Sequence, residues 1–470
     1  MKAPQTPMTR RHAIGVVGAA LSAAVAAGAP VAAQRRTTPA PVGSGEFLLR
    51  GGRVLTVDET LGELRRGDVH IRQGVIEAVA GRIDAPRAAV IDATGMIVLP
   101  GFIDTHWHMW NSVWRGMAND ATEYFRLQSL AAHYTPDDHY TAVMYAGTEA
   151  ISAGFTTCHN WAHGVRSYAD VEAEMRALSA LGLRARMGYV GVIGGKPTSA
   201  DDLRRALAWI AANGQGRLSL SMLLDGAGQQ FAPQVRLARE LGLKTITDHG
   251  GFLAYPDTIG PDFLYTHGTA LTPAQITLIA ARGIKVGLCP GTDPMIGAGL
   301  PPIDALRAAG VPLSNISMTI DVNAQTPVDP FAMLRMLVNA GRIQQAQSTN
   351  LQAIAQANTR WRLSYDEALQ IGTSSGANVL GLSDQTGSLT PGKRADVIMI
   401  RTTDPNMLPA PGANATWQLI QHGLPSNVDT VFIDGVVRKR GGRMVGVDVA
   451  KVSAGAAALQ TALRQRARLN

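Results

Sequence analysis

Cysteine is nearly absent, since the chain of 470 residues has two, Cys158 and Cys289. Two cysteines cannot build the disulfide framework that stabilises small exported domains. Each lies in an apolar stretch with the composition of a buried strand, so we expect two buried free thiols. A hydrophobic core must therefore supply the stability.

Charged residues are also sparse, at 17% of the chain, and the formal net charge is +7. Lys and Arg are spread along the sequence without a long basic run, and no aromatic motif of the RNA-binding type is present. Nucleic acid is therefore excluded as an expected partner. Hydrophobic residues make up 46% of the chain, which is enough for one large domain with an appendage, or for two to three ordinary domains.

An apolar run of small residues lies at the N-terminus. MKAPQTPMTRRHAIG is followed by VVGAALSAAVAAGAPVAAQ, which is the order of a signal peptide at residues 1–33 with cleavage after Ala33. The run is too short and too rich in Ala and Gly for a spanning helix, so we expect no stable membrane anchor. Thr9-Arg10-Arg11 favours a twin-arginine signal, with an ordinary secretory peptide as the alternative. We expect an exported protein, periplasmic or secreted.

The remaining chain changes its pattern several times. Short strands with turn residues, as in GRVLTV, predict a small β-sandwich made from both ends of the mature chain. Between them, apolar runs alternate with helical patterns, as in VRLARELGLKTITDHGG, and this alternation predicts an α/β fold with a (β/α)8 TIM barrel. The predicted parts are a linker at 34–45, sandwich strands at 46–100 and 385–445, the barrel at 101–384 and a C-terminal helix at 446–470.

The stretch DTHWHMW places two histidines one residue apart at the end of a predicted strand. Residues i and i+2 of a strand point the same way, so His106 and His108 can converge on one ion. His249, His267 and Asp321 close three further predicted strands. Because barrel active sites lie at the C-terminal ends of the strands, we expect these five side chains to meet there.

Several other residues near strand ends are candidates for a substrate pocket. Trp110 and Phe252 would give it an apolar wall for an aromatic or bulky substrate. His159 and His163, in TTCHNWAHG, follow another strand. Ordinary core packing is the alternative for each of them. The segment GLCPGTDPMIGAG is glycine-rich but lacks the Lys-Ser/Thr pair of a phosphate-binding loop.

Three long segments, in order, resemble the amidohydrolase superfamily, in its cytosine deaminase and triazine chlorohydrolase branch. PGFIDTHWH is similar to the strand-1 signature of that superfamily. YTHGTALTPAQITLIAARGIKVGLCPGTDPMIGAG resembles the segment from strand 6 to strand 7, and EALQIGTSSGANVLGLSDQTGSLTPGKRADVIMI resembles the C-terminal return into the sandwich. The resemblance covers essentially the whole mature chain.

The resemblance implies one divalent metal ion, with His267 beside it and with four ligands: His106, His108, His249 and Asp321. Binuclear members of the superfamily bridge two ions through a carboxylated lysine on strand 4, and the corresponding stretch here, RLSLSMLLDGAG, has no lysine. Three imidazoles and a carboxylate suit zinc, with iron, cobalt or manganese as alternatives. The resemblance also allows a homo-oligomer, whose size the sequence does not determine.

The chemistry of such a site follows from its residue types. A metal ion with an open position lowers the pKa of its bound water toward 7. Asp321 would accept the proton of that water and pass it to the leaving group. His267 would stabilise the charge that develops on the substrate. Asp293 lies where relatives of the branch often have an asparagine that contacts the substrate, so it joins the predicted substrate-binding residues.

One departure from the family pattern affects the predicted reaction. Deaminases and chlorohydrolases of the family usually carry His-x-x-Glu at strand 5, where the glutamate protonates a ring nitrogen of the substrate. Here His249 is followed by Gly250, Gly251 and Phe252, so that acid is missing. The adjacent Asp248 should point away from His249 on a strand. Asp225 is the better substitute because it should close strand 4, with a turn aspartate before Gly226 as the alternative.

The missing glutamate decides how we order the possible functions. Hydrolysis of an amide, carbamate or urea needs no ring-nitrogen acid, so a metal-dependent amidohydrolase acting on such a non-peptide carbon–nitrogen bond of a small molecule is the first prediction. A deaminase or hydrolytic dehalogenase of an N-heterocycle is the second. A non-catalytic exported barrel that binds metal or ligand is the third, and it leaves the retained ligand set without a use.

Overall fold

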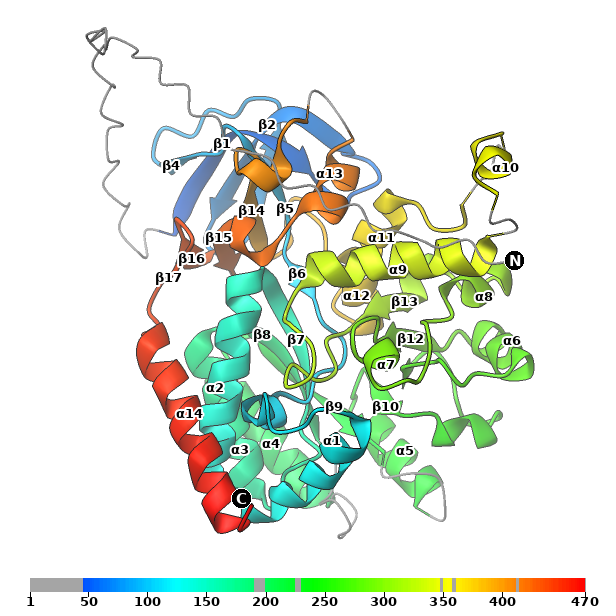
Figure 1. Cartoon of the computed structure of the whole chain (residues 1–470). Coiled ribbons are helices and arrows are strands. Elements are labelled where there is room, and N and C mark those ends of the chain that lie inside the picture. The colour runs from blue at the N-terminus through cyan, green and yellow to red at the C-terminus, as the bar shows by residue number, and fades with distance from the viewer. Residues whose placement is uncertain are drawn as a thin grey trace, which may run out of the picture. The chain divides into compact units, whose positions relative to one another are not determined.

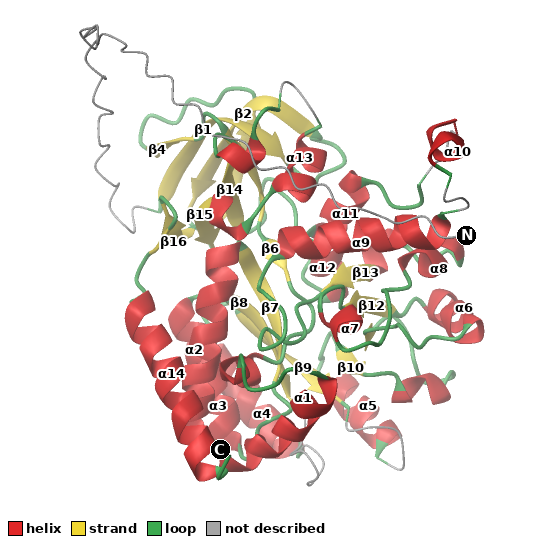
Figure 2. Cartoon of the chain, viewed as in Figure 1, coloured by secondary structure: helices red, strands yellow, loops and turns green. Residues whose placement is uncertain are grey.

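The computed structural model describes residues 45–189, 199–224, 230–346, 350–356, 361–410 and 414–469. The predicted signal peptide, nearly all of the predicted linker, and Asp225 lie outside the described residues. Two sheets organise the described chain, an eight-stranded parallel sheet and a nine-stranded mixed sheet (Figures 1 and 2). The predicted (β/α)8 barrel is therefore confirmed, and the predicted β-sandwich corresponds to a separate sheet domain.

The eight parallel strands follow one another in sequence order around the barrel. Their apolar residues are buried on both faces, as expected for strands that are covered by helices outside and by side chains inside. The strands are β6 (Phe102–Ile103), β7 (Phe155–Trp161), β8 (Arg184–Tyr189), β9 (Leu218–Leu223), β10 (Ile246–Asp248), β11 (Phe263–Thr266), β12 (Lys285–Leu288) and β13 (Ile316–Met318).

The first and last strands meet just beyond their ends. Trp107 forms an isolated parallel bridge with Asp321. The backbone N–H of His108 donates to the carbonyl of Asp321 at 2.8 Å, and the N–H of Asp321 donates to the carbonyl of His106 at 2.9 Å. These bonds bring the DTHWHMW stretch and Asp321, more than two hundred residues apart, to the same edge of the barrel.

Helices follow most of the barrel strands and surround the barrel (Figure 2). Capping residues determine where α2 begins and ends. Thr135 and Asp138 form a capping box around Pro136 at its start, and Gly154 ends the helix with φ of 96°. The helices of this part are α2 (Pro136–Ala153), α3 (Tyr168–Leu181), α4 (Ala200–Asn213), α5 (Phe231–Glu240), α6 (Pro273–Arg282), α8 (Ile303–Ala308), α9 (Pro330–Gln345), α10 (Leu351–Gln356), α11 (Tyr365–Ile371) and α12 (Ser374–Val379).

The second sheet combines strands from the N-terminal and the C-terminal parts of the described chain. Its strand order is β17-β16-β15-β14-β5-β1-β2-β3, with β4 paired to β1. The antiparallel pairing of β14 with β5 joins the C-terminal strands to the N-terminal ones. The strands are β1 (Glu46–Leu55), β2 (Glu63–Arg72), β3 (Val75–Ala80), β4 (Ala89–Asp92), β5 (Met96–Pro100), β14 (Val397–Arg401), β15 (Val428–Ile433), β16 (Val436–Arg440) and β17 (Arg443–Met444).

Two further helices and several short elements complete the described chain. The helix α13 (Ala415–His422) precedes β15, and α14 (Val449–Arg466) follows β17. No helix in the described ranges is long and apolar enough to cross a bilayer. Cys158 and Cys289 are both free and buried, as predicted.

A buried ion pair connects the barrel to the second sheet. Arg184, at the start of β8, and Asp396, just before β14, are joined by bonds of 2.6 and 3.2 Å, and both side chains are almost inaccessible to water. We expect Arg184→Met to lower the free energy of unfolding by about 3–5 kcal/mol, because it leaves a buried carboxylate without its partner. Urea unfolding measures this change.

The control for this prediction is the exposed pair Arg204–Asp201. Arg204→Met should change the free energy of unfolding by less than about 1 kcal/mol, because exposed pairs contribute little. Equal effects of the two substitutions would contradict the role assigned to the buried pair.

Candidate metal centre

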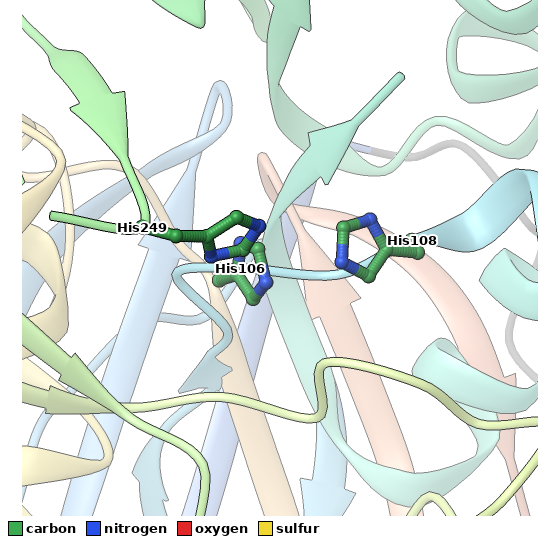
Figure 3. Close-up of side chains that lie close together, drawn as sticks. All are labelled: His106, His108 and His249. Carbon is green, nitrogen blue, oxygen red and sulfur yellow. The ribbon is translucent and has the colours of Figure 1, made fainter. Parts of the chain in front are cut away.

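The two histidines of the DTHWHMW stretch lie just beyond β6, on either side of the bridge residue Trp107. His249 is the residue directly after β10. Figure 3 shows His106, His108 and His249 gathered at one place, and their ligand nitrogens all lie within 4.8 Å of one another. The same distance encloses ligand atoms of His106, His267 and Asp321. The predicted set of five side chains is therefore brought together.

Asp321 supplies the carboxylate at the centre of this group. Its Oδ1 lies 3.1 Å from Nε2 of His106 and 3.2 Å from Nε2 of His108. Asp321 and His267 have positive φ angles of 60° and 73°, a conformation that costs about 1–3 kcal/mol for residues other than glycine. Strain of this kind is typical of functional positions, and here it turns both side chains toward the group.

Residues that contact the candidate ligands from behind hold them in position. The Asp104 carboxyl group accepts hydrogen bonds from the backbone N–H groups of His106 and Ile320 at 3.0 and 2.6 Å, which connects the ends of β6 and β13. His249 Nδ1 lies 3.1 Å from the Thr266 hydroxyl, and His267 Nδ1 lies 2.7 Å from Asp293 Oδ1. These contacts engage Nδ1 of both imidazoles and leave Nε2 available.

A glycine directly after His249 is required by the packing there. Gly250 has φ of 112°, and a Cβ atom at this position would lie 2.4 Å from the ring of Tyr265. Only glycine adopts this turn without strain or a clash. The chain can therefore leave β10 sharply, which keeps the His249 ring at the end of the strand.

The protonation states fit a metal ligand set. Burial lowers the pKa of His106 well below its usual value, which leaves the imidazole neutral with a free lone pair. Burial acts to raise the pKa of Asp321, but His267, His106 and His108 outweigh it and hold that pKa well below its usual range. Neutral imidazoles and an ionised carboxylate are the forms that bind a divalent ion.

The residues present therefore fit one divalent metal ion held by His106, His108, His249 and Asp321. A second candidate cluster contains His267, Cys289 and Asp293. Burial raises the pKa of the Cys289 thiol well above its usual value, so the sulfur stays protonated and is a poor ligand. The first cluster is the better metal site.

A cavity of about 490 Å³ opens beside the metal ligands. This volume is in the range of small-molecule sites. Its lining includes six of the residues predicted from the sequence, which are His108, His163, His249, His267, Asp293 and Asp321. The remaining lining residues are Tyr124, Phe125, Gln128, Thr269, Thr292, Ile296, Ala298, Val322 and Gln325.

Two of the predicted wall residues do not line this cavity. Trp110 is fully buried, and its indole N–H donates to His163 Nδ1 at 3.4 Å, so it lies behind a lining residue. Phe252 is also fully buried and packs its ring against those of Phe263 and Tyr265. Both residues are in short 3-10 helices, η1 (Met109–Trp114) and η3 (Gly251–Ala254), whose turns point them into the core.

Three of the nine lining residues that the sequence analysis missed come from one segment. Tyr124 and Phe125 lie on α1 (Ala121–Leu127), and Gln128 begins η2 (Gln128–His133). This α1–η2 segment (residues 121–133) belongs to the long connection after β6, on the face where barrel active sites form. The length of that connection was the sequence feature that could have pointed to these lining residues. His159, in contrast, bonds to Thr105 and Ser221 through its two nitrogens and is a core residue.

Comparisons with known proteins agree with this arrangement. 5-Methylthioadenosine/S-adenosylhomocysteine deaminase of Desulforudis audaxviator is 27% identical over 450 residues, covering 86% of this chain and 95% of that protein. 5'-Deoxyadenosine deaminase of Methanobrevibacter smithii is 27% identical over 415 residues, covering 82% and 90%.

Solved structures have the same fold. An adenosine deaminase from Xanthomonas campestris with bound zinc superposes with a TM-score of 0.74 at 21% identity, covering 89% of this chain and 99% of that one. The atrazine chlorohydrolase of Arthrobacter aurescens, complexed with zinc, superposes with a TM-score of 0.74 at 20% identity, covering 88% and 100%.

The model of the Amidohydrolase family matches residues 97–233 and 235–438. These ranges include the four candidate ligands, His267 and the strands that carry them. The chain therefore belongs to the amidohydrolase family and is a hydrolase of carbon–nitrogen bonds other than peptide bonds, as the sequence analysis predicted.

Proposed function

We propose that this protein is a zinc-dependent hydrolase that removes an amino group from a small N-heterocycle. The observation that carries the proposal is the convergence of three imidazoles and the ionised Asp321 at a cavity of about 490 Å³. The names of the relatives that match most of the chain, deaminases of adenosine derivatives, support a heterocycle over the acyclic amide that was our first prediction. Zinc is supported by the donor set and by the zinc bound in both structural neighbours.

The chain's own residues divide the reaction between them. A bound zinc ion would supply a water with a lowered pKa beside the cavity. Asp321 would accept one proton of this water as the oxygen attacks the carbon that bears the amino group. That proton would then go to the leaving nitrogen as the carbon–nitrogen bond breaks, and the second proton of the water would end on the ring nitrogen, so that water and substrate become ammonia and the oxo product.

The proton for a ring nitrogen needs a donor other than the family glutamate. Phe252 occupies that position and is buried away from the cavity. Among the described residues that line the cavity, the carboxyls are Asp293 and Asp321. The pair of Asp293 with His267 Nδ1, at 2.7 Å, leaves the other imidazole nitrogen for the substrate. We assign the ring-nitrogen contact to His267, oriented by Asp293.

We expect Asp293→Asn to lower kcat by about 10-fold to 100-fold, because His267 loses the charged partner that orients it and stabilises its positive charge. Ammonia release measures the rate. Asp257→Asn is the control, since the Asp257 side chain is 97% exposed and pairs with Arg282. A rate within twofold of the wild type for Asp293→Asn would contradict the assignment.

One observation favours a second function, the hydrolysis of amides, carbamates or ureas. Phe252 stands where family deaminases have a glutamate that protonates the substrate ring, and hydrolysis of these acyclic compounds does not need that acid. A screen of the purified mature protein compares 5'-deoxyadenosine, aminopyrimidines and aminotriazines with these acyclic compounds. Ammonia from a heterocycle supports the proposal, and turnover confined to acyclic compounds would overturn it.

We also propose that the chain is exported through residues 1–33 by the twin-arginine route. The support is the arrangement of Arg10 and Arg11 before an apolar run of small residues. We expect replacement of both arginines by lysine to leave the full-length precursor in the cytoplasm, as fractionation and immunoblotting would show. Unchanged export of the double variant would favour the ordinary secretory route.

A further inference from the structure

We propose that the C-terminal helix α14 positions the α1–η2 segment, and through it the wall of the substrate cavity, with Gln460 as the positioning residue. The kinetic part of this inference rests on the proposed function, while its structural part does not. The helix comes from the end of the chain and follows the second sheet, yet it lies along α2 beside the barrel (Figure 1).

The apolar face of α14 shares a core with the cavity wall. Ala456, Leu459 and Leu463 are buried in one cluster with residues of the connection after β6 and with Val322, which follows Asp321. The members contributed by that connection are Trp110, Val113, Trp114, Tyr124, Leu127, Leu130, Ala131 and Tyr134. A displacement of the helix would therefore uncover the core that the helix shares with the cavity wall.

Polar contacts fix the register of the helix on this connection. The Gln460 amide donates to the carbonyls of Val113 and Arg115 at 2.7 and 2.9 Å, where η1 ends. Arg466 donates to the carbonyl of His133, the last residue of η2, at 2.5 Å and pairs with Asp138 at 2.6 Å. The α1–η2 segment is thus held on both sides, before its first residue and at its last.

The segment held in this way supplies three lining residues of the cavity. Tyr124 and Phe125 lie on α1, and Gln128 lies where η2 begins. The Gln128 side chain is 3.3 Å from His163 Nε2, which brings the segment to the histidine next to His108. Phe125 is 59% exposed at the cavity, so its position depends on the backbone of the segment more than on its own packing.

We therefore expect α14 to affect substrate binding by the cavity wall and not the catalytic groups. The four metal ligands follow the barrel strands within a few residues, and in the described chain α14 makes no hydrogen bond or ion pair with any of them. A loss of the Gln460 contacts should therefore loosen the wall that holds the substrate and leave the reacting groups in place. Substrate affinity should change more than the rate of the bound complex.

The test compares Gln460→Met with Gln465→Met in the zinc-loaded mature protein. Methionine keeps the length and apolar contacts of Gln460 but removes its N–H donors, and Gln465 is an exposed residue of the same helix. Arg466→Ala is the second variant, with Arg464→Ala as its control. Hydrogen exchange of residues 113–133 is the first readout, and KM and kcat with the best substrate of the screen are the second.

We expect Gln460→Met to speed exchange in residues 113–133 by about tenfold, since two hydrogen bonds to that backbone are lost. KM should rise about fivefold to tenfold, while kcat stays within about threefold and the zinc content stays the same. Arg466→Ala should act in the same direction. The Gln465 and Arg464 variants should match the wild type.

Each alternative result has a distinct meaning. Unchanged exchange in both test variants would overturn the positioning role. Faster exchange with an unchanged KM would overturn its connection to substrate binding, and a fall in kcat alone would do the same. If no substrate of the screen is turned over, the proposed function fails, and the exchange measurement still decides whether α14 positions the segment.

Discussion

Replacement of Asp321 by Asn should lower kcat by about 10³-fold or more, because it removes both a metal ligand and the group that takes the proton from water. The carboxylate oxygen lies 3.1–3.2 Å from two of the imidazoles, and its pKa is held well below the usual range. An amide of the same shape can neither accept the proton nor balance the charge of the ion. Ammonia release under saturating substrate measures the loss.

Two measurements distinguish a loss of catalysis in Asp321→Asn from a loss of folding. Circular dichroism of Asp321→Asn should match that of the wild type, since the backbone bonds of Asp321 to His106 and His108 do not involve its side chain. Asp201→Asn, at a side chain that is 95% exposed, should keep full activity. Residual activity of Asp321→Asn within tenfold of the wild type would show that another group is the base.

Replacement of His106 by Ala should reduce the bound metal to well under one ion per chain and reduce activity to the background. His106 is fully buried, and its Nε2 lies near both Asp321 and the other ligand nitrogens. Its loss removes one of four ligands and leaves a small hole at the centre of the group. Elemental analysis of the dialysed protein measures the metal.

The same substitution should also remove the stabilisation that a bound ion provides. A ligand present at 1,000 times its Kd stabilises the folded state by about 4 kcal/mol, so added zinc should raise the Tm of the chelated wild type and not that of His106→Ala. His422→Ala is the control, since His422 is an exposed residue at the end of α13. If His106→Ala kept one ion and its activity, the assigned metal site would be wrong.

The candidate ligands could be predicted from the sequence because their pattern is local. His106 and His108 are two residues apart just after β6, and His249, His267 and Asp321 each follow an apolar strand within a few residues. Parallel strands bring such positions to the same edge of a barrel whatever the loops between them do. The fold class followed from the same alternation of strands and helices.

The cavity wall could not be predicted in the same way. Trp110 and Phe252 lie in short 3-10 helices, where a shift of one residue in register rotates a side chain by about 120° around the helix axis. Tyr124, Phe125 and Gln128 belong to a long connection whose position depends on distant packing. Part of that packing comes from Leu459 and Leu463, which lie more than three hundred residues further along the chain.

The most direct test of the metal-dependent reaction is a zinc titration of the chelated, purified protein, followed by ammonia release from its best heterocyclic substrate. The chain's ligand set, three histidines and Asp321, predicts no activity without metal, a linear rise, and a break at one zinc ion per chain. Activity that survives chelation, or a break at two ions per chain, would contradict the single metal centre on which the proposed function depends.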